Sequence, residues 1–420
     1  MRKDTTKGLE AAREERAGWL EAQLRRKTRE WIEIMVEEEL DSALGTGRHE
    51  RSEERRGYRK GRRPRTLTTS NGKHMLDLPR GEYFEVGPEG QKAWHSQIIP
   101  RYSRRTEAVE EGVIRAYLGG CNTRRVEQAL SPLLEGAALS KSTVSRVVER
   151  LSRGFEAWRN RDLAGEDIAI LFLDGLILKM RLAGKVEKIP VLSAIGVRRD
   201  GQRVLLTLEA RTSESEAAWS AVTEDLAARG VKAPILAVID GNGGLQNAVK
   251  TTWPSIDVGR CTKHKLANLF THAPKRRYKE IKADYHAIVY AKSEAQARVA
   301  YARFERKWGK SCPGVVKSLR EGGEELLTFF RYPKGMRKML RTTNCIERLN
   351  EEFRRRVKTQ GSLPNVEAGL KLLYGLFAGG LIRLRRVDAW KQMPSLVDRR
   401  RQELGLATMK PETDTLDKAA

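Results

Sequence analysis

Two aspartates in this sequence lie within or at the end of apolar runs, where a carboxylate is costly. Asp174 interrupts the run 168–182, IAILFLDGLILKMRL, and Asp240 ends the run that closes on VIDG. Burying an unpaired carboxylate costs on the order of several kcal/mol unless a cation or a hydrogen-bond donor meets it. For Asp174 a second interpretation is equally supported, because Asp-Gly between apolar segments is typical of a tight hairpin turn. Asp174 is therefore either a turn residue or an inward-facing carboxylate on a strand.

The elements around the two aspartates predict where they lie relative to each other. Apolar, β-branched runs predict three successive strands, followed by a helix, a buried strand that opens into a helix, and a further short strand and helix; these lie at 168–182, 188–201, 202–213, 215–230, 233–254 and 257–270. A three-strand meander followed by alternating helix and strand is the order of a ribonuclease H-like sheet. In that layout the first and fourth strands are parallel neighbours, which places Asp174 beside Asp240.

Composition narrows the class of partner. The 420 residues hold 80 Lys and Arg against 55 Asp and Glu, a formal net charge of +25, with a pI near 10.0. The electrostatic field of a protein with this positive net charge attracts polyanions, and nucleic acid is the expected partner. No apolar run approaches the roughly 18 to 20 residues that span a membrane, and the first residues lack a signal-peptide core. We therefore expect a cytoplasmic, nucleoid-associated protein without a membrane partner.

Other motifs are missing from the chain. The four cysteines lie far apart with no CxxC pair, so neither a disulfide framework nor a four-cysteine zinc site is indicated. No Walker A and no GxGxxG sequence occurs, which argues against a nucleotide cofactor.

The N-terminal part predicts a helix and then a basic segment. Apolar residues at near-helical spacing over 9–44 predict an amphipathic helix within 1–46, which either packs on a core or dimerises. The basic run 47–67 is by default a solvated linker, although it would also suit a DNA backbone. Short strands are expected at TLTT, HMLDLP and QIIPRY, so 47–104 is predicted as a basic linker with a small β-rich segment.

Residues 105–160 predict a helix-turn-helix-like DNA-binding region. Two short helices precede Ser140, a plausible N-cap, and a third helix that carries Val144, Val147, Val148 and Leu151 on one face. Its polar face would enter a major groove. The residues of that face are Lys141, Ser142, Ser145, Arg146 and Arg150.

The C-terminal part is predicted to be mostly helical. We expect the first part of the ribonuclease H-like core at 165–270, an all-helical insertion at 271–338, the last part of the core at 339–395 and a tail at 396–420. The predicted fold class is thus α+β and multidomain, with a mixed sheet interrupted by the helical insertion and preceded by the helical DNA-binding region.

Ordered motifs over roughly 50–390 resemble the bacterial Mutator-type insertion-sequence transposases. They are GYRKGRRPRTL, LSKSTVSRV, RCTKHKLANL, FERKWGKSCPGVVKSL, RTTNCIERLNEEFRRRVKTQGSLP and EAGLKLLY. The resemblance implies a DDE triad of Asp174, Asp240 and Glu347, of which Glu347 is singled out only by its TTNxIExLN context. It moves the interpretation of Asp174 from turn residue to metal ligand. It also implies metal-dependent DNA cleavage and strand transfer.

The chemistry of such a reaction suits these residues. Phosphodiester cleavage and strand transfer are in-line displacements at phosphorus, which two Mg²⁺ ions can assist. Mg²⁺ prefers oxygen ligands, so a few carboxylates and the substrate phosphate suffice. We expect Mg²⁺, with Mn²⁺ as a substitute, on Asp174, Asp240 and Glu347.

The resemblance marks further residues. Cys261 and His264 match a Cys-x-x-His pattern, for which we favour a structural or DNA-proximal role over metal binding. Trp308 is either a core residue or a platform that stacks on a base near the cut. Of the cations on the Glu347 helix, some are expected to hold phosphates near the scissile bond and the others to be solvated; they are Arg348, Arg354, Arg355, Arg356 and Lys358.

The leading hypothesis is a transposase acting on double-stranded DNA, both the terminal inverted repeats of its element and the target, as a homodimer or higher oligomer. Departures from the family, such as Cys345 and the GNGGL that follows Asp240, touch no carboxylate. A domesticated regulatory DNA-binding protein is disfavoured by the intact triad. A structure-specific nuclease on the same fold is disfavoured by the separate end-binding region and the long insertion.

Overall fold

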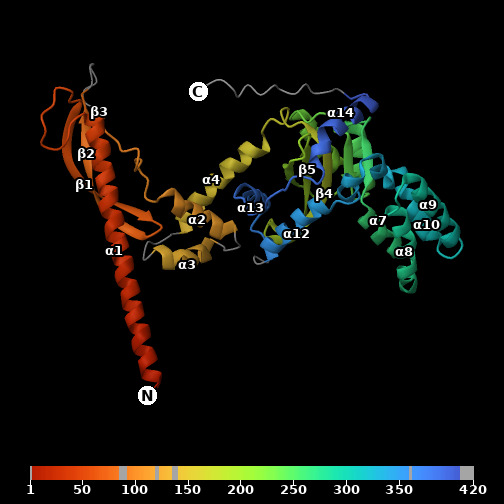
Figure 1. Cartoon of the computed structure of the whole chain (residues 1–420), viewed down its shortest axis with the longest axis horizontal. Coiled ribbons are helices and arrows are strands. Elements are labelled where there is room, and N and C mark those ends of the chain that lie inside the picture. The colour runs from red at the N-terminus through yellow and green to blue at the C-terminus, as the bar shows by residue number, and fades with distance from the viewer. Residues whose placement is uncertain (1, 85–91, 119–122, 135–140, 359–361, 407–420) are drawn as a thin grey trace. The chain divides into compact units, whose positions relative to one another are not determined.

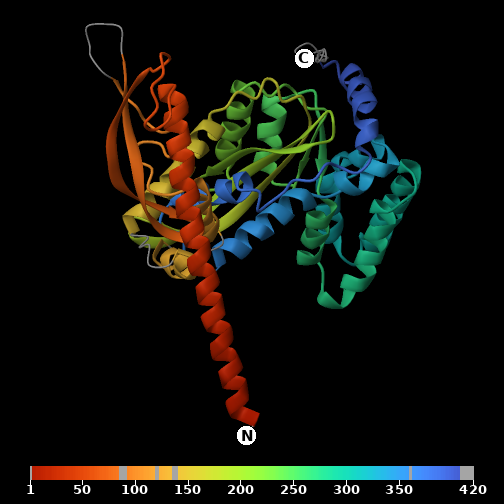
Figure 2. The ribbon, with the colours of Figure 1, turned by 60° about the vertical axis from the view of Figure 1, so that its left-hand side comes forward.

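The computed structural model describes residues 2–84, 92–118, 123–134, 141–358 and 362–406. The chain forms two compact units, Met1–Arg150 and Leu151–Ala420. Figures 1 and 2 show the ribbon of each unit. No described helix combines the length and the apolar character needed to cross a membrane.

The first unit begins with a long helix that packs on a small sheet. Helix α1 (Arg2–Leu44) precedes the antiparallel pair β1 (Gly57–Thr69) and β2 (Gly72–Tyr83), and β3 (Lys92–Ala93) pairs with β2. The end of α1 buries Val36, Leu40 and Leu44 against the sheet. Earlier apolar residues of α1, including Leu24 and Trp31, are exposed. From Gly18 onward, where the side chains of α1 are described, it is the last part of the helix that packs on the core of this unit.

The default prediction of a solvated linker at 47–67 was wrong for its second half, which forms β1. Arg59 and Arg62 of this strand donate hydrogen bonds to the Glu37 carboxylate of α1. Two arginines that the sequence suggests are solvated are therefore paired with a carboxylate on the neighbouring helix. The strand expected at QIIPRY is absent from the described structure, because 97–102 forms bends and a turn. The strands expected at TLTT and HMLDLP are confirmed.

The helices predicted over 105–160 are confirmed as α2 (Glu107–Leu118), α3 (Thr123–Leu134) and α4 (Lys141–Arg159). Val109, Val113 and Val126 of α2 and α3 share a small apolar cluster. Ser140, the expected N-cap, lies outside the described residues.

The second unit contains a mixed five-stranded sheet of order β6-β5-β4-β7-β8. Its strands are β4 (Ile168–Leu182), β5 (Lys185–Arg198), β6 (Arg203–Ala210), β7 (Leu236–Ile239) and β8 (Asp257–Arg260). The pairs β4–β5 and β5–β6 are antiparallel, whereas β4–β7 and β7–β8 are parallel. The predicted meander, and the parallel pairing of its first strand with the fourth, are therefore confirmed.

The hairpin interpretation of Asp174 was wrong. Asp174 pairs with Ser193 and Gly175 with Leu192, so β4 continues through both residues. The chain reverses instead at Ala183 and Gly184, which both have positive φ.

Helices cover the sheet and extend from its β8 edge. The α-helices described after β6 are α5 (Glu216–Ala228), α6 (Gly243–Thr252), α7 (Thr262–Thr271), α8 (Tyr278–Val289), α9 (Glu294–Trp308), α10 (Pro313–Gly322), α11 (Lys334–Leu340), α12 (Asn344–Lys358), α13 (Val366–Ala378) and α14 (Met393–Glu403). Trp219 of α5 and Leu245 of α6 pack into one core with the strands. Helices α8 to α10, teal in Figure 1, form the predicted helical segment, and α12 contacts β4.

Candidate active site

Asp174 and Asp240 lie level with each other on neighbouring parallel strands. Phe172 of β4 pairs with Val238 of β7, and an aspartate follows two residues later in each segment: Asp174 within β4 and Asp240 directly after the end of β7. Burial is the main cause that raises the pKa of Asp174 to about 6, and the charge of Asp240 adds to it. The two carboxylates thus repel each other at the carboxyl end of β7.

A tight turn fixes Asp240 at the end of its strand. The Asp240 carboxylate accepts a hydrogen bond from the Asn242 backbone N–H at 2.9 Å, and Asn242 in turn caps α6. Gly241 has φ +104, a conformation that favours glycine. Its carbonyl accepts a 2.6 Å bond from the buried guanidinium of Arg260. Arg260 is held by Glu321 of α10, so the helical segment supports this turn.

Glu347 lies in the first turn of α12, where a carboxylate is favoured by the helix dipole. It accepts hydrogen bonds from Thr343 Oγ1 at 3.0 Å and from Lys263 Nζ at 2.5 Å. Burial raises the pKa of Glu347, but Lys263, Thr343 and His264 outweigh burial, and the net pKa is lowered. The charge of Glu347 also contributes to the raised pKa of Asp174, so the third carboxylate lies close enough to Asp174 to affect its ionisation.

Asn350, one helical turn after Glu347, was not recognised in the sequence. Its Nδ2 donates a 2.8 Å hydrogen bond to Asp174 Oδ2, and its side chain is only 1% exposed. Spacing predicts only that Asn350 shares a helix face with Glu347, because residues three apart do so. Its contact with Asp174 depends on how α12 packs on β4. Thr343 and Lys263, which bond to Glu347, were also not recognised.

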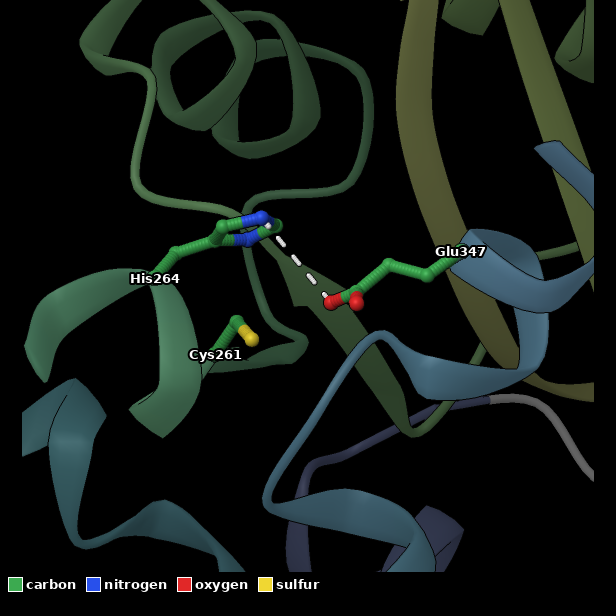
Figure 3. Close-up of side chains that lie close together, drawn as sticks. All are labelled: Cys261, His264 and Glu347. Carbon is green, nitrogen blue, oxygen red and sulfur yellow. Dashed lines mark ion pairs between the residues drawn. The ribbon is translucent and has the colours of Figure 1, made fainter. Parts of the chain in front are cut away.

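Cys261 and His264 lie beside Glu347 (Figure 3). Donor atoms of the three side chains lie within 4.8 Å of one another, and His264 Nε2 is 3.8 Å from Glu347 Oε1. Interaction with Cys261 is the main cause that raises the pKa of His264 to about 9, and Glu347 and Asp174 contribute. Burial raises the pKa of the Cys261 thiol, but its contacts with His264 and Thr343 outweigh burial and lower it.

The remaining predicted residues lie outside this cluster. Trp308 ends α9 with only 2% of its surface exposed, and its indole N–H donates to Asp284 at 3.0 Å. Base stacking by Trp308 stays a prediction, and it requires the ring to leave this position. On α12, Arg348, Arg354, Arg355 and Lys358 are exposed, and Arg356 is half-buried.

The structure describes the predicted groove-reading residues only in part. The side chains of Lys141, Ser142 and Ser145 lie outside the described residues. Arg146 and Arg150 of α4 are exposed, and Arg150 forms an ion pair with Glu110.

Comparison of this chain with known protein families identifies the class of protein to which it belongs. The profile described as "Transposase, Mutator family" matches residues 2–380. This chain belongs to the Mutator family of transposases.

Individual proteins that are similar in sequence to this chain are also transposases. The chain is 34% identical over 353 residues to the transposase for insertion sequence element ISRM5 of Rhizobium meliloti (strain 1021), covering 84% of this chain and 86% of that protein. It is 33% identical to the transposase for insertion sequence element IS406 of Burkholderia multivorans, covering 83% and 89%. A chain of the Drosophila P element transposase strand transfer complex matches at 11% identity, over 70% of this chain and 85% of its own, with a TM-score of 0.28.

Proposed function

We propose that this transposase is of the DDE type, and that it cleaves and joins DNA at the ends of an insertion sequence with divalent ions held by Asp174, Asp240 and Glu347. The observation that carries the proposal is the placement of the Asp240 segment beside Asp174 in parallel register, with the helix of Glu347 tied to Asp174 through Asn350. Burial and the charges of Asp240 and Glu347 accordingly raise the pKa of Asp174. Carboxylates that repel one another in a partly buried site favour a divalent cation. The strand order also supports a ribonuclease H-like core.

The oxygen-rich donor set fits Mg²⁺, with Mn²⁺ as a substitute. When bound, the ions activate an attacking oxygen and stabilise the leaving oxygen at phosphorus. The chain's own residues set the geometry for this. Asn350 donates a hydrogen bond to one oxygen of Asp174, while Thr343 orients Glu347.

DNA binding is the second part of the proposal. Cations on α12 begin next to Glu347, and Arg348 and Arg354 are exposed on that helix, so we assign them to phosphate binding near a scissile bond. We assign recognition of the element ends to the region before residue 160, with α4 as the groove-reading helix. The active form is proposed to be a homodimer or higher oligomer on DNA.

Incubation of the full-length protein with its element's end DNA and Mg²⁺, followed by mapping of nicked and joined strands, tests this function. Asp174→Asn, Asp240→Asn and Glu347→Gln are expected to lose cleavage and joining while retaining end binding, because each removes a metal ligand but no phosphate-binding cation. Glu351→Gln, an exposed site on the same helix as Glu347, is the matched control and should remain active. Substantial joining by any triad variant would remove that residue from the proposed site.

A further inference from the structure

A sulfur, a nitrogen and an oxygen donor gather at the start of α7. They belong to Cys261, His264 and Glu347, and they lie within 4.8 Å of one another. Figure 3 shows Cys261 and His264 from one segment facing Glu347 from α12. The set is chemically unlike the Asp174 and Asp240 pair, because it mixes a soft donor with harder ones.

One of these side chains has a polar atom that the surrounding protein leaves without a partner, because His264 Nδ1 is buried without a hydrogen bond. Cys261 is fully buried at the N-cap position of α7 and makes no capping hydrogen bond. Its thiol contacts His264 and Thr343 instead. Buried polar atoms in native proteins are normally satisfied by protein, water or an ion. An ion bound through His264 Nδ1 would satisfy that atom.

We propose that Cys261, His264 and Glu347 form a binding site for a thiophilic divalent cation of the Zn²⁺ class. Three protein ligands of S, N and O type with one position left open are a common zinc arrangement, whereas Mg²⁺ prefers oxygen alone. Zinc–ligand bonds of about 2.0 to 2.3 Å require the donors to close by about 1 Å. On binding, Cys261 ligates as the thiolate and His264 as the neutral imidazole, so the protons that the thiol and the imidazolium carry pass to solvent and metal–sulfur and metal–nitrogen bonds replace the S–H and N–H bonds. The His264 side chain is 37% exposed and gives the ion a path from solvent.

The site shares Glu347 with the proposed catalytic centre. A carboxylate drawn to zinc beside Cys261 is withdrawn from the Asp174 and Asp240 pair, so zinc at this site inhibits Mg²⁺-dependent cleavage. This consequence rests on the proposed function, whereas the binding itself does not.

Binding is tested with Co²⁺ alone on the full-length protein without DNA. Co²⁺ is a spectroscopic substitute for Zn²⁺, and thiolate ligation gives an intense near-ultraviolet charge-transfer band. We expect that band, its loss in Cys261→Ser, and affinity reduced by roughly tenfold or more in His264→Ala and Glu347→Gln. Cys312→Ser, which removes another buried free cysteine, should bind Co²⁺ like the wild type. Circular dichroism of each variant verifies folding. The absence of the band in the wild type, or its persistence in folded Cys261→Ser, overturns the proposal.

Inhibition is tested separately by adding Zn²⁺ to cleavage reactions in excess Mg²⁺. Each variant is compared with its own zinc-free rate, so a lower basal rate does not matter. Zn²⁺ should inhibit the wild type and Cys312→Ser at a concentration roughly tenfold or more below that needed for Cys261→Ser. Equal sensitivity of all three proteins overturns inhibition through this site. An inactive wild type in the absence of zinc would instead count against the proposed function, and the Co²⁺ spectra stand apart from that outcome.

Discussion

Asn350 donates a hydrogen bond of 2.8 Å from its Nδ2 to Asp174 Oδ2, across 176 residues of sequence. This bond joins the helix that carries Glu347 to the middle of β4. The Asn350 Oδ1 atom is buried without a partner, so the amide has further bonding capacity within the site. Carboxylates that bind metals are commonly oriented by such a neighbour, and its loss typically weakens metal binding about 10- to 100-fold. We therefore regard Asn350 as a positioning residue for Asp174.

Replacing Asn350 should separate positioning from folding. Asn350→Leu keeps the approximate volume but removes the donor. It is expected to reduce Mg²⁺-dependent cleavage and Mn²⁺ affinity, measured by electron paramagnetic resonance, by about 10- to 100-fold. Asn350→Ser should recover part of the affinity if its hydroxyl reaches Asp174.

Phe353→Leu is the matched control, because Phe353 is fully buried on the same helix but has no polar atom. This change should cost about 1 kcal/mol of folding stability without altering Mn²⁺ affinity. If Phe353→Leu weakened Mn²⁺ binding as much as Asn350→Leu does, Asn350 would be a packing residue only.

A second prediction concerns the turn after Asp240. A Cβ at Gly241 would lie 2.4 Å from Arg260 Nε, and φ there is +104. Gly241→Ala should therefore displace Arg260 or the turn, move the Asp240 carboxylate, and reduce metal affinity and cleavage by roughly tenfold or more. Gly243→Ala is the control, because a Cβ at Gly243 meets nothing within 4 Å and φ is not positive. Equal effects of the two changes on Mn²⁺ affinity would show that Arg260 and Gly241 do not set the geometry of Asp240.

Sequence reasoning located the strands of the second unit because their apolar runs are long and unbroken. It placed Asp174 beside Asp240 by topology alone, and the paired register confirms that placement. It left the hairpin open at Asp174 because Asp-Gly satisfies the local rules of a turn. Only pairing with β5, a long-range interaction, decides that point.

Other features could not be obtained from the sequence because tertiary contacts determine them. The sequence of the basic strand β1 resembles that of a linker, because the contact of its arginines with Glu37 of α1 is visible only in the structure. The hydrogen bond of Asn350 and the proximity of Cys261 to Glu347 depend on how α12 packs on the sheet. Neither a propensity nor a spacing rule contains that information.

A third prediction tests the role of Trp308. Because its ring is buried and its N–H bonds to Asp284, Trp308→Ala should cost about 3 to 5 kcal/mol of folding stability. Trp308→Phe should cost about 1 kcal/mol, since Asp284 keeps its bond from Lys307. Val299→Ala, at an exposed site on the same helix, should stay within about 0.5 kcal/mol. Normal melting of Trp308→Ala combined with lost cleavage would favour base stacking instead.

The last prediction concerns pH and uses the metal-free protein. Burial and the charge of Asp240 raise the pKa of Asp174 from 3.8 to about 6 in the folded state. Above pH 6 the carboxylate is ionised in folded and unfolded chains alike, so the folded chain carries the full cost of the buried charge. Below pH 3.8 it is protonated in both, and the cost is absent. A shift of about two pH units corresponds to about 3 kcal/mol.

Asp174→Asn should therefore stabilise the metal-free protein by about 3 kcal/mol at pH 7.5, and the gain should shrink as the pH falls from 6 towards 4. Urea unfolding of both proteins across this range measures the difference. Mg²⁺ should stabilise the wild type more than the variant at pH 7.5, because only the wild type retains the carboxylate that binds the ion. Glu351→Gln, an exposed carboxylate on α12, should show no such pH-dependent gain. A loss of stability in Asp174→Asn at pH 7.5, or a gain that is the same at every pH, would mean that Asp174 is not held as a costly buried charge.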